Sequence, residues 1–166
     1  RRLRVLTDPY VSAANALPTV AVLPLLILWF GIGEQAKLVL VVVGAVFNVL
    51  VNTQVGVENA DYRLIEVAKV FHAKRRQIFT KVMMPAAMPY ILAGIRLAVG
   101  RALIMTFVAE LFMANRGLGF IIADAGSKFE SARLFVGVFT LTIIGVLATQ
   151  AVNMIEKWKF SYGRRP

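Results

Sequence analysis

The chain contains no cysteine and only one histidine, so disulfide bonds, thiolate metal sites and histidine clusters are excluded. Charged residues are also scarce. They make up 17% of the 166 residues, whereas about 25% is usual in a soluble domain. Hydrophobic residues account for 58%, and the mean hydropathy is +0.71. This composition is typical of a membrane protein.

Motifs for enzymatic chemistry are missing as well. The sequence has no G-x-x-x-x-G-K-[ST] loop for nucleotide phosphates, no cluster of metal ligands and no nucleophile beside a base at a useful spacing. We therefore predict that the chain is not an enzyme and uses no cofactor or metal. Any ATP hydrolysis that serves it must come from another chain.

Acidic residues are too few to balance the basic ones, which leaves a formal net charge of +10. In a soluble protein such a charge would suggest nucleic acid as a partner. Here the basic residues lie beside long apolar runs, which ties them to a membrane. We predict a lipid bilayer as the surroundings and no nucleic-acid partner.

Four apolar runs are long enough to cross a bilayer as helices. The predicted spans are about 9–33, 36–54, 87–113 and 134–155, which gives an all-α integral membrane protein in one transmembrane domain. Residues 115–133, between the last two spans, are polar and rich in glycine. We expect them to form an external loop that carries a short helix.

Residues 58–85 form a charged island between the second and third spans and hold six of the nineteen Lys and Arg residues. The island is predicted to fold as two short amphipathic helices, 61–71 with Asp61 as N-cap and 74–84 ended by Pro85. We expect helix, bend and helix to lie on the membrane surface, where a soluble partner can bind. The apolar face of the first helix comprises Leu64, Val67, Ala68 and Phe71.

The basic residues also indicate an orientation. If the four spans alternate in direction, thirteen Lys and Arg residues fall on the side of residues 58–85 and the two chain ends, and four fall on the other side. Cytoplasmic loops carry the excess of positive charge in membrane proteins. This side is therefore predicted to face the cytoplasm.

Polar side chains within the spans are expensive in lipid, so they are expected to face other helices or an aqueous path. Asn48 and Asn52 either form interhelical hydrogen bonds or line a translocation path. Glu110 lies half a turn from Arg101 around the third span and cannot be its partner. It either marks the outer boundary of the span or belongs to the path.

The third span also carries small residues at a spacing that lets helices pack closely, namely Gly94, Ala98 and Ala102. Arg101 lies about 20° from Gly94 around the helix, so we expect it to point into the bundle. It is our candidate for a positive potential along an anion path. The alternative is a buried ion pair, or contact with carbonyl groups of a neighbouring helix.

The charged island resembles the EAA loop of ABC importer permeases, whose pattern is EAA, three residues, Gly, nine residues, Ile, any residue, Leu, Pro. The register agrees throughout, with Val67, His72, Val82 and Met84 departing from the usual residues. Residues 16–33, 85–103 and 108–122 resemble permeases of the nitrate, sulfonate and taurine type in the same order. Together these segments cover nearly the whole chain.

The resemblance implies a MetI-like ABC permease fold, of which this chain is expected to supply the last four of about six spans. It also implies a path for a small, anionic solute such as nitrate, a sulfonate or taurine. The implied partners are a separate ATPase subunit, a second permease copy and a solute-binding protein, all at a bacterial inner membrane. The alternative is a channel or ion-coupled carrier that needs no ATPase.

In such permeases the short loop helix lies in a groove of the ATPase and passes on its motion. The resemblance places Glu66 in this loop, where it either pairs with a basic group of the ATPase or braces the loop through Arg63 or Lys69. We assign no chemistry to the lone histidine. The residues carried over to the ATPase-coupling loop are Leu64, Glu66, Val67, Ala68, Phe71, His72, Val82 and Pro85.

Overall fold

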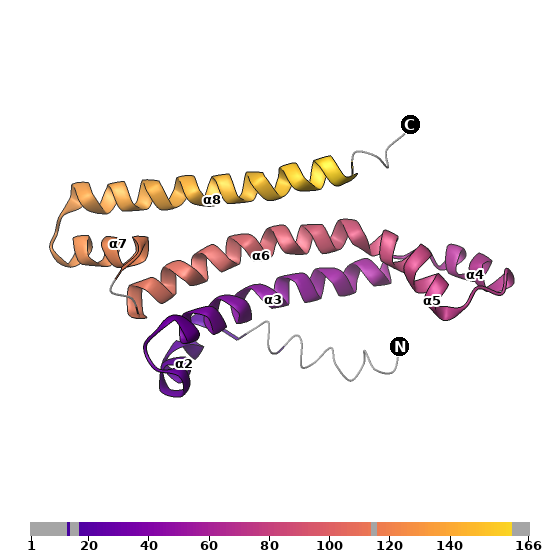
Figure 1. Cartoon of the computed structure of the whole chain (residues 1–166), viewed down its shortest axis with the longest axis horizontal. Helices are drawn as coiled ribbons and strands as arrows, with labels where there is room; N and C mark the ends of the chain where they lie inside the picture. The colour runs from indigo at the N-terminus through magenta and orange to yellow at the C-terminus, as the bar shows by residue number, and fades with distance from the viewer. Residues whose placement is uncertain (1–12, 14–16, 114–115, 161–166) are drawn as a thin grey trace. The chain divides into compact units, whose positions relative to one another are not determined.

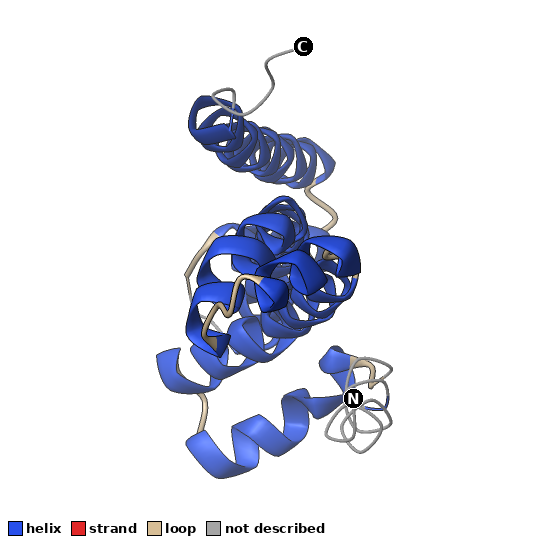
Figure 2. Cartoon of the chain, turned by 90° about the vertical axis from the view of Figure 1, so that its right-hand side faces the viewer, coloured by secondary structure: helices blue, strands red, loops and turns tan. Residues whose placement is uncertain are grey.

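A computed structural model describes residues 13, 17–113 and 116–160 of the chain. Within these residues the regular structure is helical, as Figures 1 and 2 show, and no strand is present among them. This confirms the predicted all-α architecture. The chain divides into two compact units, one formed by Arg1–Phe47 with Ala98–Pro166 and the other by Asn48–Leu97.

The first predicted span, 9–33, begins among residues outside the described part of the chain. Its described part is a 3₁₀ turn, η1 (Thr19–Val22), followed directly by helix α2 (Leu23–Phe30). Pro24 stands in the first turn of α2, where its missing N–H group removes no helical hydrogen bond. Gly31, with φ of 72°, ends α2. The described segment is apolar but shorter than a full span.

The other three predicted spans each coincide with a long helix (Figure 1). These are α3 (Glu34–Glu58), α6 (Met84–Met113) and α8 (Ser131–Phe160). Each is long and apolar enough to cross a membrane. The helices α3 and α8 extend beyond the predicted spans at both ends, so the points at which the chain enters and leaves the bilayer stay predictions.

The charged island contains α4 (Tyr62–Val70), α5 (Arg75–Ile78) and a π-helical turn, η2 (Phe79–Met83). The prediction that Pro85 ends the second short helix was wrong. Helical structure continues from Arg75 to Met113 without a break. The π turn explains why: the N–H of Met84 donates to the carbonyl of Phe79, five residues back, and this wider turn accommodates the proline that follows.

In the unit Asn48–Leu97, two glycines bring α3 and α6 close together. A Cβ atom on Gly56 would lie 2.6 Å from Tyr90 Cβ, and one on Gly94 would lie 2.9 Å from Asn52 Cβ and 3.0 Å from the carbonyl oxygen of Asn48. Only a residue without a side chain fits such approaches. The predicted packing seam at Gly94 is therefore confirmed.

The other unit has a small apolar core contributed by α2, α3 and α6. A short helix, α7 (Leu118–Ser127), packs against α8 (Figure 1), which confirms the short helix expected within residues 115–133. Only 6% of the most apolar stretch of α8 is buried. Its side chains need lipid or another protein around them. The core residues are Leu23, Leu26, Ala36, Leu40, Met105, Ala109 and Met113.

Candidate functional site

Helix α4, at the centre of the predicted coupling loop, is fixed at its N-terminus by Asp61. The Asp61 carboxylate accepts a hydrogen bond from the backbone N–H of Arg63 at 2.9 Å. This bond satisfies one of the N–H groups that a helix start leaves without a partner, and such caps are typically worth about 1 kcal/mol. The predicted N-cap is confirmed.

The C-terminus of α4 is fixed by a Schellman motif centred on His72. The N–H of Ala73 donates to the carbonyl of Ala68, and the N–H of His72 donates to that of Lys69, both at 2.9 Å. His72 has φ of 57°, a left-handed conformation that glycine adopts most easily. It occupies the position at which the EAA pattern has glycine. The bend is thus retained although the residue differs.

The apolar face of α4 is left uncovered by the rest of the described chain. The exposed fractions of Leu64, Val67 and Phe71 are 55%, 52% and 81%, and Ala68 is half-buried. A short helix with both ends fixed and apolar side chains turned to solvent is suited to docking against a second protein.

Glu66 does not brace this loop. Its side chain is exposed, and among the described residues it forms no ion pair with Arg63 or Lys69. The Lys69 ammonium lies instead over the ring of Tyr62, 5.7 Å from the ring centre. The bracing alternative is therefore wrong for this chain, and the Glu66 carboxylate is accessible to a partner.

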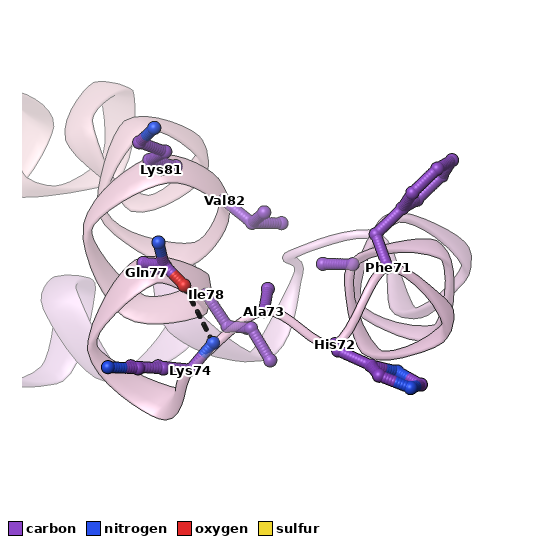
Figure 3. A pocket seen from close by; sticks show the side chains of 9 residues that line it. Phe71, His72, Ala73, Lys74, Gln77, Ile78, Lys81 and Val82 are labelled. Atoms are coloured by element: carbon purple, nitrogen blue, oxygen red, sulfur yellow. Dashed lines mark hydrogen bonds between the residues drawn. The ribbon is translucent and has the colours of Figure 1, made fainter.

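A hollow of about 550 Å³ separates the end of α4 from α5 and η2. Figure 3 shows Ala73, Ile78 and Val82 pointing toward this gap. The N–H of Lys74 donates to Gln77 Oε1 at 2.7 Å and fixes the start of α5. Sequence reasoning identified Val82 but missed the hollow, because helical periodicity does not report how two short helices are spaced. The remaining lining residues are Ala68, Phe71, His72 and Lys81.

Pro85, the last residue of the EAA-like pattern, is exposed in the first turn of α6. It belongs to the same unit as α4, α5 and η2. The structure therefore gathers every residue predicted for the coupling loop into one compact unit.

The two asparagines proposed for a path lie at the seam between α3 and α6. The amide nitrogen of Asn52 donates to the carbonyl of Asn48 on its own helix at 2.7 Å. Both residues are half-buried, and both contact the space next to Gly94. This geometry favours the packing alternative over solute contact.

Arg101 is exposed, so the prediction that it points into the bundle was wrong for the single chain. Helical periodicity gives the direction of a side chain around its own helix, but it does not say whether a neighbouring helix covers it there. Among the described residues Arg101 has no ion-pair partner. Neither the exposure of Arg101 nor its lack of an ion-pair partner tests its predicted role in an anion path.

Glu110, in contrast, is largely buried and has two partners. Its Oε1 lies 3.1 Å from Nζ of Lys37 on α3, and its Oε2 accepts a hydrogen bond from the backbone N–H of Gly119 on α7 at 2.8 Å. The exposed fractions of the two side chains are 21% for Lys37 and 14% for Glu110. Lys37 and Glu110 are 73 residues apart in the chain, and no local pattern in the sequence indicates their pairing.

Long apolar helices with little buried surface, joined by a short capped helix that presents an apolar face, define a multi-pass membrane protein. Within that class, the chain belongs to the family of binding-protein-dependent transport system inner membrane components, whose model matches residues 1–160. It is therefore a multi-pass component of the bacterial inner-membrane type.

Two relatives of the chain are named for the transport of sulfonates or taurine. The chain is 39% identical over 166 residues to SsuC of Bacillus subtilis (strain 168), which is named as a putative aliphatic sulfonates transport permease. The matched residues make up 98% of this chain and 60% of that protein. The chain is 31% identical over 155 residues to TauC of Escherichia coli (strain K12), a taurine transport system permease, covering 93% and 56%.

A third relative, ThiX of Halalkalibacterium halodurans, is a formylaminopyrimidine transport permease. It is 30% identical over 148 residues, which cover 89% of this chain and 59% of that protein. The chain thus spans about three-fifths of the length of the relatives it matches.

Proposed function

We propose that this chain is part of the transmembrane permease subunit of an ATP-driven importer and that α4 binds a separate ATPase subunit. The exposed apolar face of α4 carries the proposal. Because both ends of α4 are fixed by hydrogen bonds, a displacement imposed by a partner moves the helix as a rigid body. The continuous helix from Arg75 to Met113 then carries that displacement into the membrane.

The full transporter in this proposal contains a second permease copy and a solute-binding protein. The chain itself hydrolyses no ATP and forms no bond with its solute. Its α4 faces the cytoplasm, where the ATPase is, as the distribution of Lys and Arg residues indicates. Glu66, which has no basic partner on its own loop, is available for a basic group of the ATPase.

The docking face of α4 can be tested by moving one charge around the helix. Phe71→Asp places a carboxylate on the apolar face, and Val70→Asp places the same group off that face at a residue of similar exposure, 76% against 81%. We expect Phe71→Asp to reduce co-purification of the ATPase by about tenfold or more, as for a central interface residue. Val70→Asp is expected to retain it. Equal retention by both variants would remove α4 from the interface.

The proposed solute is a small anion of the sulfonate class. The names of two relatives support this class, and the third relative, named for a pyrimidine, shows that the family is broader. Arg101 is exposed on the single chain, as a residue that lines a path between two permease copies would be. We expect Arg101→Ala to abolish uptake with assembly intact, and Arg101→Lys to retain part of it because the charge remains. Uptake unaltered by Arg101→Ala would remove Arg101 from the path.

A further inference from the structure

The carboxylate of Glu110 holds the first turn of α7 from a different helix. Its Oε2 accepts the N–H of Gly119, which is one of the first N–H groups of α7 and has no partner within that helix. The negative charge of Glu110 also interacts favourably with the positive end of the α7 dipole. Glu110 therefore does for α7 what an N-cap side chain usually does from within its own chain segment.

The glycines at the start of α7 show how closely this turn sits on Glu110. A Cβ atom on Gly119 would lie 2.6 Å from Glu110 Cβ and 2.7 Å from the carbonyl oxygen of Phe107. A Cβ on Gly117 would collide with the Glu110 carboxylate, and φ of 117° at this residue is itself a conformation for glycine. Side chains at either position would push α7 away from α6.

The other half of α7 is attached to α8. Gly137 of α8 accommodates Ile122, whose Cγ1 would lie 2.6 Å from a Cβ atom at that position. Asp124 lies 3.0 Å from the guanidinium of Arg133, which stands in the first turn of α8. Glu110 thus links α6 to a pair of helices, α7 and α8, that are already packed together.

We propose that Glu110 is a positioning residue that makes α7 follow the movements of α6. Lys37 neutralises the carboxylate, which is otherwise costly at this depth of burial, and leaves its second oxygen for Gly119. The consequence for transport rests on the proposed function, since α6 is continuous with the segment beside α4. A displacement at that segment would then reach the first turn of α7 through the Glu110 carboxylate, in addition to the packing of Gly119 on α6.

The simplest rival role for Glu110 is to pair with Lys37 and do nothing for α7. Exchanging the two residues separates the roles. In Lys37→Glu with Glu110→Lys, an ion pair can form again between α3 and α6. The ammonium at position 110 cannot accept the N–H of Gly119, and it repels the positive end of α7.

The chain has no cysteine, so Leu118→Cys, with any cysteine outside this chain replaced by serine, gives a single-thiol probe of the first turn of α7, where Leu118 is half-buried. The rate of labelling with a water-soluble maleimide is measured in permeabilised membrane vesicles that contain the full-length protein. We expect labelling to rise about fivefold or more in Glu110→Ala and in the exchanged pair, as loss of a helix cap would give. Glu130→Gln, an exposed acid after α7 that does not contact its first turn, serves as the control and is expected to leave the rate unchanged.

Wild-type labelling in the exchanged pair would show that only the ion pair matters, and an unchanged rate in Glu110→Ala would overturn the proposal altogether. Glu110→Gln keeps an acceptor oxygen and is expected to protect Leu118→Cys better than Glu110→Ala does. ATP-dependent uptake is measured in parallel in sealed proteoliposomes that also contain the ATPase and the solute-binding protein. Its absence in the unsubstituted protein would reject the proposed function, whereas the labelling pattern would still decide whether Glu110 holds α7.

Discussion

His72 and Phe129 are the described residues other than glycine with positive φ, both at 57°. Each follows the end of a short helix, α4 or α7, and each is the centre of a Schellman motif. At the second motif, the N–H of Glu130 donates to the carbonyl of Ala125 at 2.9 Å, as Ala73 donates to Ala68 at the first. A side chain in this conformation costs on the order of 1–2 kcal/mol, which the hydrogen bonds of the motif offset.

The conformation of His72 gives a test of the coupling loop. We expect His72→Gly to raise the free energy of unfolding of this loop by about 1 kcal/mol, because glycine adopts the left-handed conformation without strain. Lys74→Gly is the matched control. Lys74 has φ of −65°, so glycine there gains nothing and loosens the start of α5. Hydrogen exchange at Ala73 reports the effect, and slower exchange only in His72→Gly is the expected result. Faster exchange in His72→Gly would contradict this explanation.

Asp124 gives a prediction about pH at the junction of α7 and α8. A hydrogen bond from Lys128, together with the charges of Lys128 and Arg133, holds the pKa of the Asp124 carboxyl below its usual value of 3.8. Because the folded pKa is the lower one, its contribution to stability is complete above the unfolded pKa and is lost as the pH falls through the folded pKa. Glu130 also pairs with Arg133 and adds a second acid to this cluster.

We therefore expect Asp124→Asn to lower the thermal stability of the protein at pH 7 and to have no effect at pH values well below 3.8. Thermal unfolding of the detergent-solubilised protein between pH 3 and pH 7 measures the difference. A difference between variant and wild type that stayed constant over this range would show that the ionised carboxylate is not what matters.

At the scale of elements, hydropathy and length were sufficient to predict α3 and α8, and Asp61 with the apolar spacing was sufficient for α4. The continuity of α5, η2 and α6 was not predictable from these signals. Proline after a short helix usually ends it, and the sequence carries no recognisable sign of a π turn. The ion pair between Lys37 and Glu110 was not predictable, because it depends on how two helices distant in the sequence, α3 and α6, pack together.

The seam between α3 and α6 can be tested with two glycines of the same helix. A Cβ at Gly94 would meet the carbonyl oxygen of Asn48 at 3.0 Å and the Cα of Val49 at 3.1 Å, backbone atoms that cannot move aside. A Cβ at Gly100 would have nothing within 4 Å. We expect Gly94→Ala to destabilise the protein by about 1–3 kcal/mol and Gly100→Ala to be neutral or slightly stabilising. Thermal unfolding in detergent compares them, and equal effects would contradict the described seam.

At the scale of the whole molecule, the described helices expose more apolar surface than a soluble chain tolerates. At most 17% of the most apolar stretch of each long helix is buried, and Phe135, Phe139 and Leu147 of α8 are each more than half exposed. Lipid covers such surface in a membrane, and a second copy can cover part of it. Composition alone was enough to predict this environment, whereas the exposure of Arg101 could only come from a structure.

The exposed face of α4 is the part of the molecule on which the proposed function depends. In the proposed function, a separate ATPase supplies the energy for transport, and that energy reaches the chain through the face of α4. The face of α4 formed by Leu64, Val67 and Phe71 is an exposed apolar surface on the charged island, between two membrane-spanning helices. The account therefore depends on an ATPase seated on that face.

The most direct test is uptake of a radiolabelled sulfonate into proteoliposomes that contain the full-length protein, its neighbouring solute-binding protein and the ATPase. We expect uptake that requires ATP, is lost in Phe71→Asp and persists in Val70→Asp. Uptake that continued without ATP or without the ATPase would contradict the account and indicate a channel or ion-coupled carrier, and ATP-dependent uptake equal in the two variants would contradict an ATPase seated on α4.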